Sequence, residues 1–258
     1  MSNAVIDCLM NHRSVRKYKE QPVDEATLDV ILRAGVRAAS AGNLQHYSLV
    51  VVDDPAVKTA LGTIDGETVP YIVNAPVVIM AMVDEYRFKR WVELNDAPFY
   101  NHHIVNLMIG AWDAIVVLQN IVIAAESLGL GTVYVGMAVS MDVRRMLGVP
   151  DYVIPAGMVC MGYPDEQPDL RTRLPLEAVV HRNCYQIPTD AEIQAYHRER
   201  DASWSQLAEE RRQKLEARGI HNAAQRVTVG HYTEEFLIGE SRGIRRNIEQ
   251  AGFVLEED

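Results

Sequence analysis

The pattern of apolar and polar positions is most regular over residues 96–129, where it predicts one long buried helix. Within 113–128 apolar residues fall on nearly every side of such a helix, and Asp113, Asn120 and Ser127 recur at seven-residue intervals in one narrow polar row. A helix of this kind is buried in a protein core, in a membrane or against a second copy of the chain. We therefore expect this segment to be the centre of the fold.

The predicted helix begins near Asp96, a capping residue followed by Pro98, and ends at Gly129, which can adopt the left-handed conformation that closes a helix. At roughly 1.5 Å per residue it would be about 45 Å long, more than the width of an average small domain. We expect part of it to pack on a partner chain. Its longest stretch without charged or amide side chains is shorter than the about 20 residues that cross a bilayer, so we expect no membrane span.

Shorter patterns predict four strands and several helices around this segment. The strands are expected over 47–52, 75–83, 132–137 and 154–161, where β-branched and other apolar residues dominate. Helices are expected near 5–10, over 24–38, over 141–147 and in the mixed-charge region after residue 190.

The remaining segments suggest how the chain is divided. Residues 84–95 are rich in charge and form either a surface excursion or a lid. We expect a core made of residues 1–190 and a helical extension, residues 191–258, whose weak apolar faces pack on the core or on a partner subunit.

Composition narrows the function classes. The chain has 258 residues, 48% of them hydrophobic, and its formal net charge of −10 argues against nonspecific binding to nucleic acid or to anionic membranes. Three widely spaced cysteines, Cys8, Cys160 and Cys184, form no C-x-x-C pair, and we expect them to be reduced, buried thiols of a cytoplasmic protein. The N-terminus shows no basic region followed by an apolar run, so we expect no secretory signal.

A dense basic segment, HRSVRKYK, begins at His12 and stands out in an acidic chain. The guanidinium groups of Arg13 and Arg16 can form bidentate, charge-assisted hydrogen bonds to a phosphate, and the hydroxyl of Ser14 adds a donor. The alternative is a solvated surface turn, which this segment taken alone leaves open.

Two further regions offer groups for a ligand. A segment of small residues after the second predicted helix has amide and hydroxyl groups suited to the edge of a heterocycle, on Ser40, Gly42, Asn43 and Gln45. In the proline-rich loop over 162–175, Arg171 and Arg173 lie two positions apart, so in an extended segment both would face one anion. An ordinary turn and a pair of surface arginines are the alternatives.

Several common catalytic signatures are absent from the sequence. G-x-S-x-G, H-E-x-x-H and P-loop motifs are missing, which removes the local case for serine hydrolase, zinc protease and P-loop chemistry. The segment GLGTVYVG closes a helix before a strand, whereas a dinucleotide-binding fold needs the strand first. His102 and His103 are adjacent and would point in different directions on a helix, so we expect no metal site.

Four segments resemble the FMN-dependent nitroreductase family, and in particular its NADPH nitroreductase and flavin reductase branch. They are, in chain order, HRSVRKY, AASAGNLQ, AAESLGLGTVYVG and GYPDEQPDLRTRLP. The resemblance implies an α+β fold with a mostly antiparallel sheet flanked by helices. It also implies an intertwined homodimer with two FMN sites at its interface.

The resemblance further implies roles for individual residues. The phosphate and ribityl chain of FMN would be held by His12, Arg13, Ser14, Arg16 and Arg173. The turn that borders the cofactor would contain Ser40, Gly42, Asn43 and Gln45. The strand along the isoalloxazine would contain Tyr134, Val135, Gly136 and Met137. Arg171 would lie close to the flavin or its phosphate, as a cation that can stabilise the reduced flavin.

The implied reaction is a ping-pong cycle in which FMN carries the chemistry. NADPH or NADH passes hydride to N5 of the flavin and leaves, and a nitroaromatic, a quinone or free flavin then receives the electrons. No acid, base or nucleophile of the protein is expected to act. Met137 stands where family members often have glycine, and HNAAQRVTVG offers only Arg226 where the branch has adjacent arginines. The acceptor range and the NADPH preference therefore stay open.

Two alternatives to this reading are a flavoenzyme of the same fold with different chemistry, such as dehalogenation or flavin cleavage, and a non-catalytic flavin-binding or interaction protein. Residues 84–95 would discriminate between the enzymes, because a specialised substrate needs a dedicated lid.

Overall fold

The structure is a computed structural model that describes residues 2–64 and 66–255. The chain divides into two compact units, Met1–Leu170 with Glu240–Asp258, and Arg171–Gly239. These differ from the predicted division into residues 1–190 and 191–258, because the later turns of helix α10 (Glu234–Ala251) return to the first unit. There Asn247 and Ala251 are buried.

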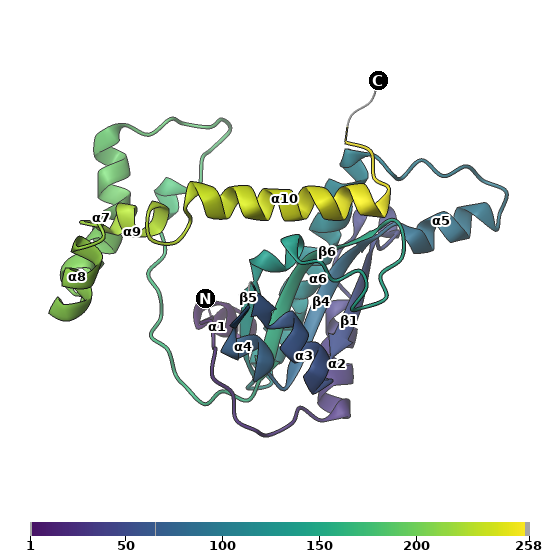
Figure 1. Ribbon diagram of the computed structural model, residues 1–258, viewed down its shortest axis with the longest axis horizontal. Coiled ribbons are helices and arrows are strands. Elements are labelled where there is room, and N and C mark those ends of the chain that lie inside the picture. Colours follow the sequence, from purple (N-terminus) through teal and green to yellow (C-terminus); the bar gives the residue numbers. More distant parts are fainter. Residues whose placement is uncertain (1, 65, 256–258) are drawn as a thin grey trace. The chain divides into compact units, whose positions relative to one another are not determined.

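The first unit is built on a four-stranded sheet with the strand order β1-β4-β6-β5 (Figure 1). The strands are β1 (Tyr47–Val52), β4 (Val77–Asp84), β5 (Gly131–Val135) and β6 (Val153–Gly162). Every neighbouring pair in this sheet is antiparallel. The expected α+β fold with an antiparallel sheet is confirmed.

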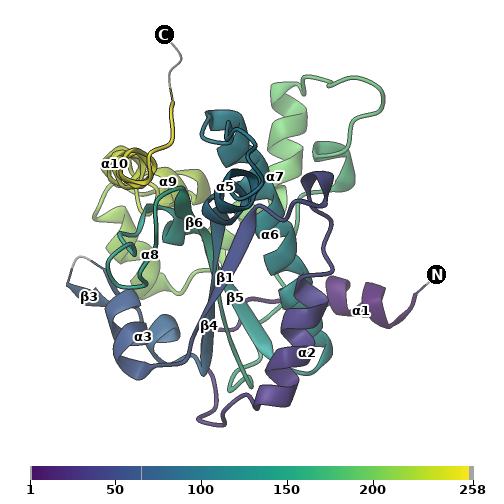
Figure 2. The ribbon, with the colours of Figure 1, turned by 90° about the vertical axis from the view of Figure 1, so that its right-hand side faces the viewer.

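Strand β4 is buried on both faces and divides its side chains between two clusters. The odd-numbered residues from Val77 to Val83 pack with helices α2 and α6, and the even-numbered residues from Val78 to Met82 pack with α3 and α4. This alternation follows from the period of two along a strand. Figure 2 shows the sheet with α2 and α6 on one side and α3 on the other. The helices are α2 (Glu25–Gly35), α3 (Pro55–Leu61), α4 (Pro70–Val73) and α6 (Ile104–Ser127).

The central helix α6 begins at Ile104, so the predicted start near Asp96 is wrong. The backbone of Asp96 is left-handed, with φ of +54°, and its amide donates to the carbonyl of Glu93 at 3.2 Å. Asp96 therefore terminates the preceding helix α5 (Tyr86–Glu93) and does not cap α6. The predicted end is confirmed, because α6 stops at Ser127 and Gly129 has a φ of +85°.

Within one chain, α6 is buried on one side only. Residues such as Ala114, Leu118 and Ile121 are fully buried in the core, while a continuous stripe of apolar side chains along the other side is between 41% and 61% exposed. The stripe consists of Ile104, Val105, Met108, Trp112, Ile115 and Val116. By length and composition α6 could also cross a membrane, a test that the core helix of a water-soluble protein passes as well.

Two local predictions after β5 are wrong. The strand expected over 132–137 ends at Val135, and the next residues form a short 3-10 helix, η2 (Gly136–Ser140). The helix expected over 141–147 does not form. The side-chain amide of Asn247 donates to the carbonyls of Val139 (2.9 Å) and Met141 (3.0 Å) and ties this non-helical segment to α10.

The cysteines are free thiols with different exposure. Cys160 is fully buried in β6, and burial raises the pKa of its thiol to about 12. Cys8 is half-buried and Cys184 is exposed, so the expectation of three buried thiols holds only for Cys160.

The shorter elements complete the chain (Figure 1). In the first unit they are α1 (Ala4–Met10), η1 (Ala41–Asn43), β2 (Thr63–Ile64) and β3 (Glu67–Thr68). The second unit contains η3 (Leu176–Ala178), α7 (Asp190–Ser205), α8 (Glu209–Glu216) and α9 (Ala223–Thr228). A helical C-terminal region was expected, and the structure shows it.

Candidate functional site

The basic segment, residues 12–19, lies along the edge strand β5 and the loop that follows β6. The amide of Val15 donates to the carbonyl of Thr132 at 2.8 Å, and the amide of Lys19 donates to the carbonyl of Tyr163 at 2.9 Å. Gly131 permits this approach, since a Cβ there would lie 2.7 Å from side-chain atoms of Val15. Backbone contacts thus fix the course of the segment and leave its charged side chains available.

Glu126, near the end of α6, positions the start of the basic segment. One oxygen of its carboxylate lies 2.8 Å from Nδ1 of His12 and accepts the hydroxyl of Thr132 at 2.6 Å. The Glu126 side chain is only 14% exposed, so solvent weakens these contacts little. The imidazole of His12 is therefore oriented by a residue of the central helix.

The two arginines of the basic segment contact backbone carbonyls and an aromatic ring. Arg13 donates to the carbonyls of Asn11 (3.2 Å) and Pro168 (3.1 Å), and the guanidinium of Arg16 lies 5.9 Å from the ring centre of Tyr71. Within residues 2–64 and 66–255, neither arginine forms an ion pair. In a chain of net charge −10, unpaired guanidinium groups fit the binding of an anionic ligand.

Backbone amides in the same segment already hold an anionic oxygen. The amides of Arg16 and Lys17 donate to one carboxylate oxygen of Glu166, at 2.6 and 3.1 Å. Glu166 therefore occupies these two amides, and a phosphate bound by the segment would rely on the guanidinium groups of Arg13 and Arg16. Sequence reasoning missed Glu166, which lies 150 residues from Arg16 in the chain and has no local signal.

A cavity of about 850 Å³ lies beside Arg13, but its lining is acidic. It contains the carboxylates of Asp7, Glu126, Asp165 and Glu166 against the single guanidinium of Arg13. Four carboxylates would repel a phosphate, so this cavity is a poor place for one.

The second predicted region, which we call the 40–47 turn, has an unusual backbone. Gly42, Asn43 and Gln45 each have a φ of +56°. This is the left-handed backbone region, which residues other than glycine rarely adopt. A non-glycine residue held there costs of order 1–3 kcal/mol, which surrounding contacts must offset. The predicted turn is present, and it exposes Gly42, Asn43 and Gln45 to solvent.

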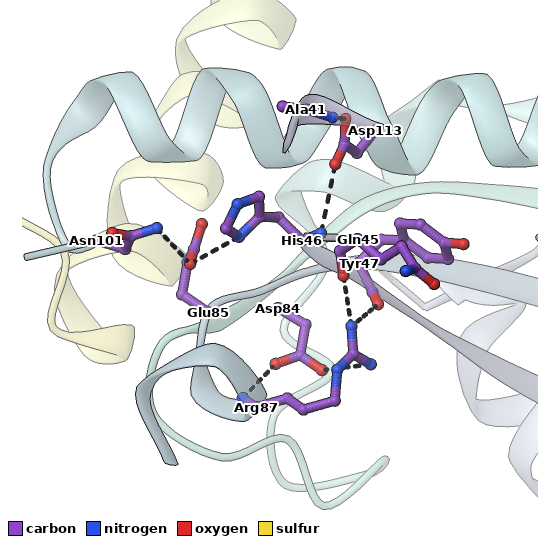
Figure 3. Close-up of polar contacts among 9 residues, drawn as sticks. All are labelled: Ala41, Gln45, His46, Tyr47, Asp84, Glu85, Arg87, Asn101 and Asp113. Carbon is purple, nitrogen blue, oxygen red and sulfur yellow. Dashed lines mark hydrogen bonds and ion pairs between the residues drawn. The ribbon is translucent and has the colours of Figure 1, made fainter. Parts of the chain in front are cut away.

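Asp113 of α6 holds both ends of the 40–47 turn (Figure 3). Its Oδ1 accepts the amide of Ala41 at 3.0 Å, and its Oδ2 accepts the amide of His46 at 3.3 Å. Asp113 is only 5% exposed. Its position in a polar row of an otherwise apolar helix was visible in the sequence, but its partner was not.

Residues around α5 hold the same turn from another direction (Figure 3). Nη2 of Arg87 donates to the carbonyls of Gln45 and Tyr47, the latter at 3.1 Å. The buried imidazole of His46 lies 3.0 Å from Oε2 of the buried Glu85. Residues 84–95 are thus tied to the turn, a contact that sequence reasoning missed.

The two predicted regions do not meet within one chain. The basic segment is anchored at Glu126 and the 40–47 turn at Asp113, thirteen positions apart on α6. At 1.5 Å per residue, thirteen positions of helix are about 20 Å. One copy of the chain therefore presents the two candidate regions at separate places.

The predicted strand residues follow Thr132, the residue of β5 that bonds to the basic segment. Tyr134 is half-buried, its hydroxyl lies 3.3 Å from Oε1 of Gln119, and burial raises the pKa of its phenol, with a further contribution from Glu126. Val135 is buried, whereas Gly136 is exposed, with nothing within 4 Å of where a Cβ would be. Met137 is half-buried in η2. The backbone at Gly136 is open to a flat ligand.

Arg171 and Arg173 belong to the second unit, whereas the other predicted site residues belong to the first. Both are exposed, and Arg173 lines a cavity of about 420 Å³ in that unit together with Tyr196 and Arg198. Their predicted contact with the cofactor stays a prediction. No group of His, Cys, Asp and Glu side chains suited to a metal ion is found in the part of the chain that the structure describes.

These features define a class: an α+β protein with an antiparallel sheet between helices and a basic segment laid along one edge strand. The chain belongs to the nitroreductase family, whose sequence profile matches residues 9–163. It is an oxidoreductase of that family, as the four sequence segments predicted.

Relatives and solved structures agree with this membership. An NADPH-dependent oxidoreductase of Staphylococcus haemolyticus is 32% identical over 228 residues, which cover 80% of this chain and 90% of the relative. The structure of NfrA2 from B. megaterium is 29% identical, covers 99% of this chain and 100% of its own, and has a TM-score of 0.84. The NADPH:FMN oxidoreductase from Vibrio harveyi, solved in complex with NAD+, is 28% identical, with coverages of 94% and 98% and a TM-score of 0.74.

Proposed function

We propose that the chain is an FMN-dependent oxidoreductase that takes electrons from a reduced nicotinamide nucleotide and passes them to nitroaromatic, quinone or flavin acceptors. The observation that carries the proposal is the basic segment, whose Arg13 and Arg16 guanidinium groups form no ion pair among the described residues. The names of the relatives support it, since they specify NADPH as the donor and, for the Vibrio harveyi protein, FMN.

In this proposal each candidate region has a separate task. Arg13, Ser14 and Arg16 bind the FMN phosphate, with His12 oriented by Glu126 toward the ribityl chain. Arg173 joins the phosphate contacts. Bound FMN supplies reversible hydride and electron transfer, which no side chain of the protein supplies.

The remaining residues shape the place of the flavin ring. The strand from Tyr134 to Val135 and the open backbone at Gly136 lie along the ring, with Met137 limiting the space beside it. The 40–47 turn borders the ring through Ser40, Gly42, Asn43 and Gln45. Arg171 stabilises negative charge on the reduced ring.

We also propose that the active form is a homodimer in which each site combines two copies. The anchors of the basic segment and of the 40–47 turn lie about 20 Å apart along α6 in one chain. The exposed apolar stripe of α6, from Ile104 to Val116, is a surface that a second copy would cover. In this dimer, the second copy would supply the residues that one copy lacks at each site.

The proposal includes a cytoplasmic location, because Cys184 is an exposed free thiol, which oxidising compartments disfavour. The donor is NADPH or NADH, and the relatives named for NADPH support the former.

The experiment is steady-state oxidation of NADPH and of NADH by the purified chain reconstituted with FMN, with a nitroaromatic or a quinone as acceptor. We expect acceptor-dependent oxidation of at least one nucleotide, and none when FMN is removed. If neither nucleotide is oxidised by the reconstituted protein with any of these acceptors, the proposed function is wrong.

A further inference from the structure

We propose that Asp113 and Arg87 form a two-sided clamp that holds the 40–47 turn in its left-handed conformation. The inference rests on the proposed function, in which this turn borders the flavin ring. Both side chains bond to backbone groups of the turn, so they act as positioning residues for the cofactor.

The turn needs support from outside itself. Asn43 and Gln45 are held with φ of +56°, as is the neighbouring Gly42. Isolated segments leave such a conformation readily, because other backbone regions are open to asparagine and glutamine. A persistent left-handed pair therefore requires contacts that fix the turn on both sides.

Asp113 supplies the contact on the amide side. Its two oxygens accept the amides of Ala41 and His46, which bracket the left-handed residues. The carboxylate is 5% exposed, and within the described residues no cation pairs with it. A buried charge without a cation is costly unless hydrogen bonds stabilise it, and here the donors come from the turn.

Arg87 supplies the contact on the carbonyl side. Its Nη2 donates to the carbonyls of Gln45 and Tyr47, and its Nη1 lies 3.9 Å from the carboxylate of Asp84. Asp113 belongs to the central helix and Arg87 to α5, so the turn is held between two elements (Figure 3). Movement of α5 would release the carbonyl side of the turn while Asp113 keeps the amide side in place.

The test uses two variants and two matched controls. Asp113→Asn keeps the side-chain shape but places a donor against one of the two amides, and Arg87→Met keeps the aliphatic stem without the guanidinium. Arg90 lies on the same helix α5, but its guanidinium pairs with Glu93 and not with the turn. Arg90→Met is therefore the control for Arg87→Met. Val117→Ala, one turn further along α6, lowers stability while leaving the clamp intact.

Hydrogen exchange of the peptide covering Ala41–Tyr47 is measured in the FMN-free protein, and the FMN dissociation constant is measured by flavin fluorescence. In Asp113→Asn we expect both exchange and dissociation constant to rise about tenfold, the effect of losing one hydrogen bond to a charged group. For Arg87→Met we expect about threefold, because the guanidinium is partly exposed. The two controls should leave both quantities near those of the unaltered protein.

The outcomes separate the clamp from the proposed function. Unchanged exchange in Arg87→Met, a surface variant expected to fold, would overturn the clamp even if Asp113→Asn failed to fold. Faster exchange with unaltered FMN affinity would overturn the role of the clamp in positioning the cofactor. If the unaltered protein binds no FMN, the proposed function falls, and the exchange data alone decide whether the clamp exists.

Discussion

Arg13 and Arg16 of the basic segment have no acidic partner among the described residues, whereas the 40–47 turn presents backbone groups that charged side chains from α5 and α6 hold in place. The two arginines are free to bind an anion, because their charges are not paired within the protein. The charged side chains at the turn instead fix its backbone conformation. Binding strength and ring placement are thus assigned to different parts of the chain.

The largest expected effect comes from separating the two regions by breaking the dimer. Trp112→Glu places a charge at the middle of the exposed α6 stripe, where Trp112 is 61% exposed within one chain. Two copies of the charge would repel across a two-fold interface, so we expect monomers that have also lost FMN. Sedimentation velocity gives the oligomeric state, and flavin absorbance gives the FMN content.

The matched control for this change is Val30→Glu, an exposed apolar residue on α2. It should leave both oligomeric state and FMN content unaltered. A monomeric Trp112→Glu variant that keeps FMN at full occupancy would mean that one copy of the chain makes the whole site.

The next largest effect concerns the basic segment alone. In the double variant Arg13→Ala with Arg16→Ala we expect the FMN dissociation constant to rise about 100-fold or more, because two charge-assisted contacts to phosphate are lost. The dimer should persist, since neither side chain belongs to the core. Fluorescence titration and gel filtration measure the two properties, and retention of FMN at near-normal affinity would refute the phosphate assignment.

Alkaline pH offers a smaller test of how the basic segment is fixed. The hydroxyl of Tyr18 donates to the carbonyl of Val15 at 2.8 Å, and burial raises the pKa of the phenol above its usual value of 10.0. The folded state therefore holds this proton more tightly than the unfolded chain. The contribution of this phenol to the free energy of unfolding is fully present below about pH 10 and is lost as the pH rises further.

The variant Tyr18→Phe should be less stable at pH 7 by about 1 kcal/mol, because Val15 loses a hydrogen-bond donor. Its free energy of unfolding should then fall less steeply above pH 10 than that of the unaltered protein. Urea denaturation at a series of pH values measures both quantities. Parallel pH profiles for the two proteins would show that the phenol of Tyr18 does not set the alkaline limit.

The smallest effect tests the strain in the 40–47 turn. Gln45→Gly removes the cost of a left-handed side-chain-bearing residue, which should raise the free energy of unfolding by up to about 1 kcal/mol. The looser turn should at the same time weaken FMN binding severalfold. Thermal denaturation and fluorescence titration check the two parts, and a variant that loses stability would contradict the account of strain.

Most of the fold was predictable because long apolar runs have few alternatives. Strand β1 matches its predicted bounds, and β4 and β6 differ from theirs by only one or two residues at each end. The start of α6 was not predictable, because Asp96 can cap a following helix or end a preceding one. The choice depends on its left-handed backbone, which the sequence does not display.

The candidate site was predictable only where one short segment carries its own chemistry. The arginines of the basic segment and the small residues of the 40–47 turn were visible in the sequence. The residues that hold them were not, because Glu126, Glu166, Asp113 and Arg87 act on groups far away in the chain. Long-range contacts between a side chain and a backbone group leave no periodic pattern to read.

The most direct test of the proposed function is a visible spectrum of the purified protein, followed by anaerobic titration with NADH and, separately, with NADPH. We predict a flavin spectrum, present on purification or after addition of FMN, that bleaches on titration with at least one of the two nucleotides. That result would identify the donor and leave the acceptor to be screened. A colourless protein that takes up no added FMN would contradict the account.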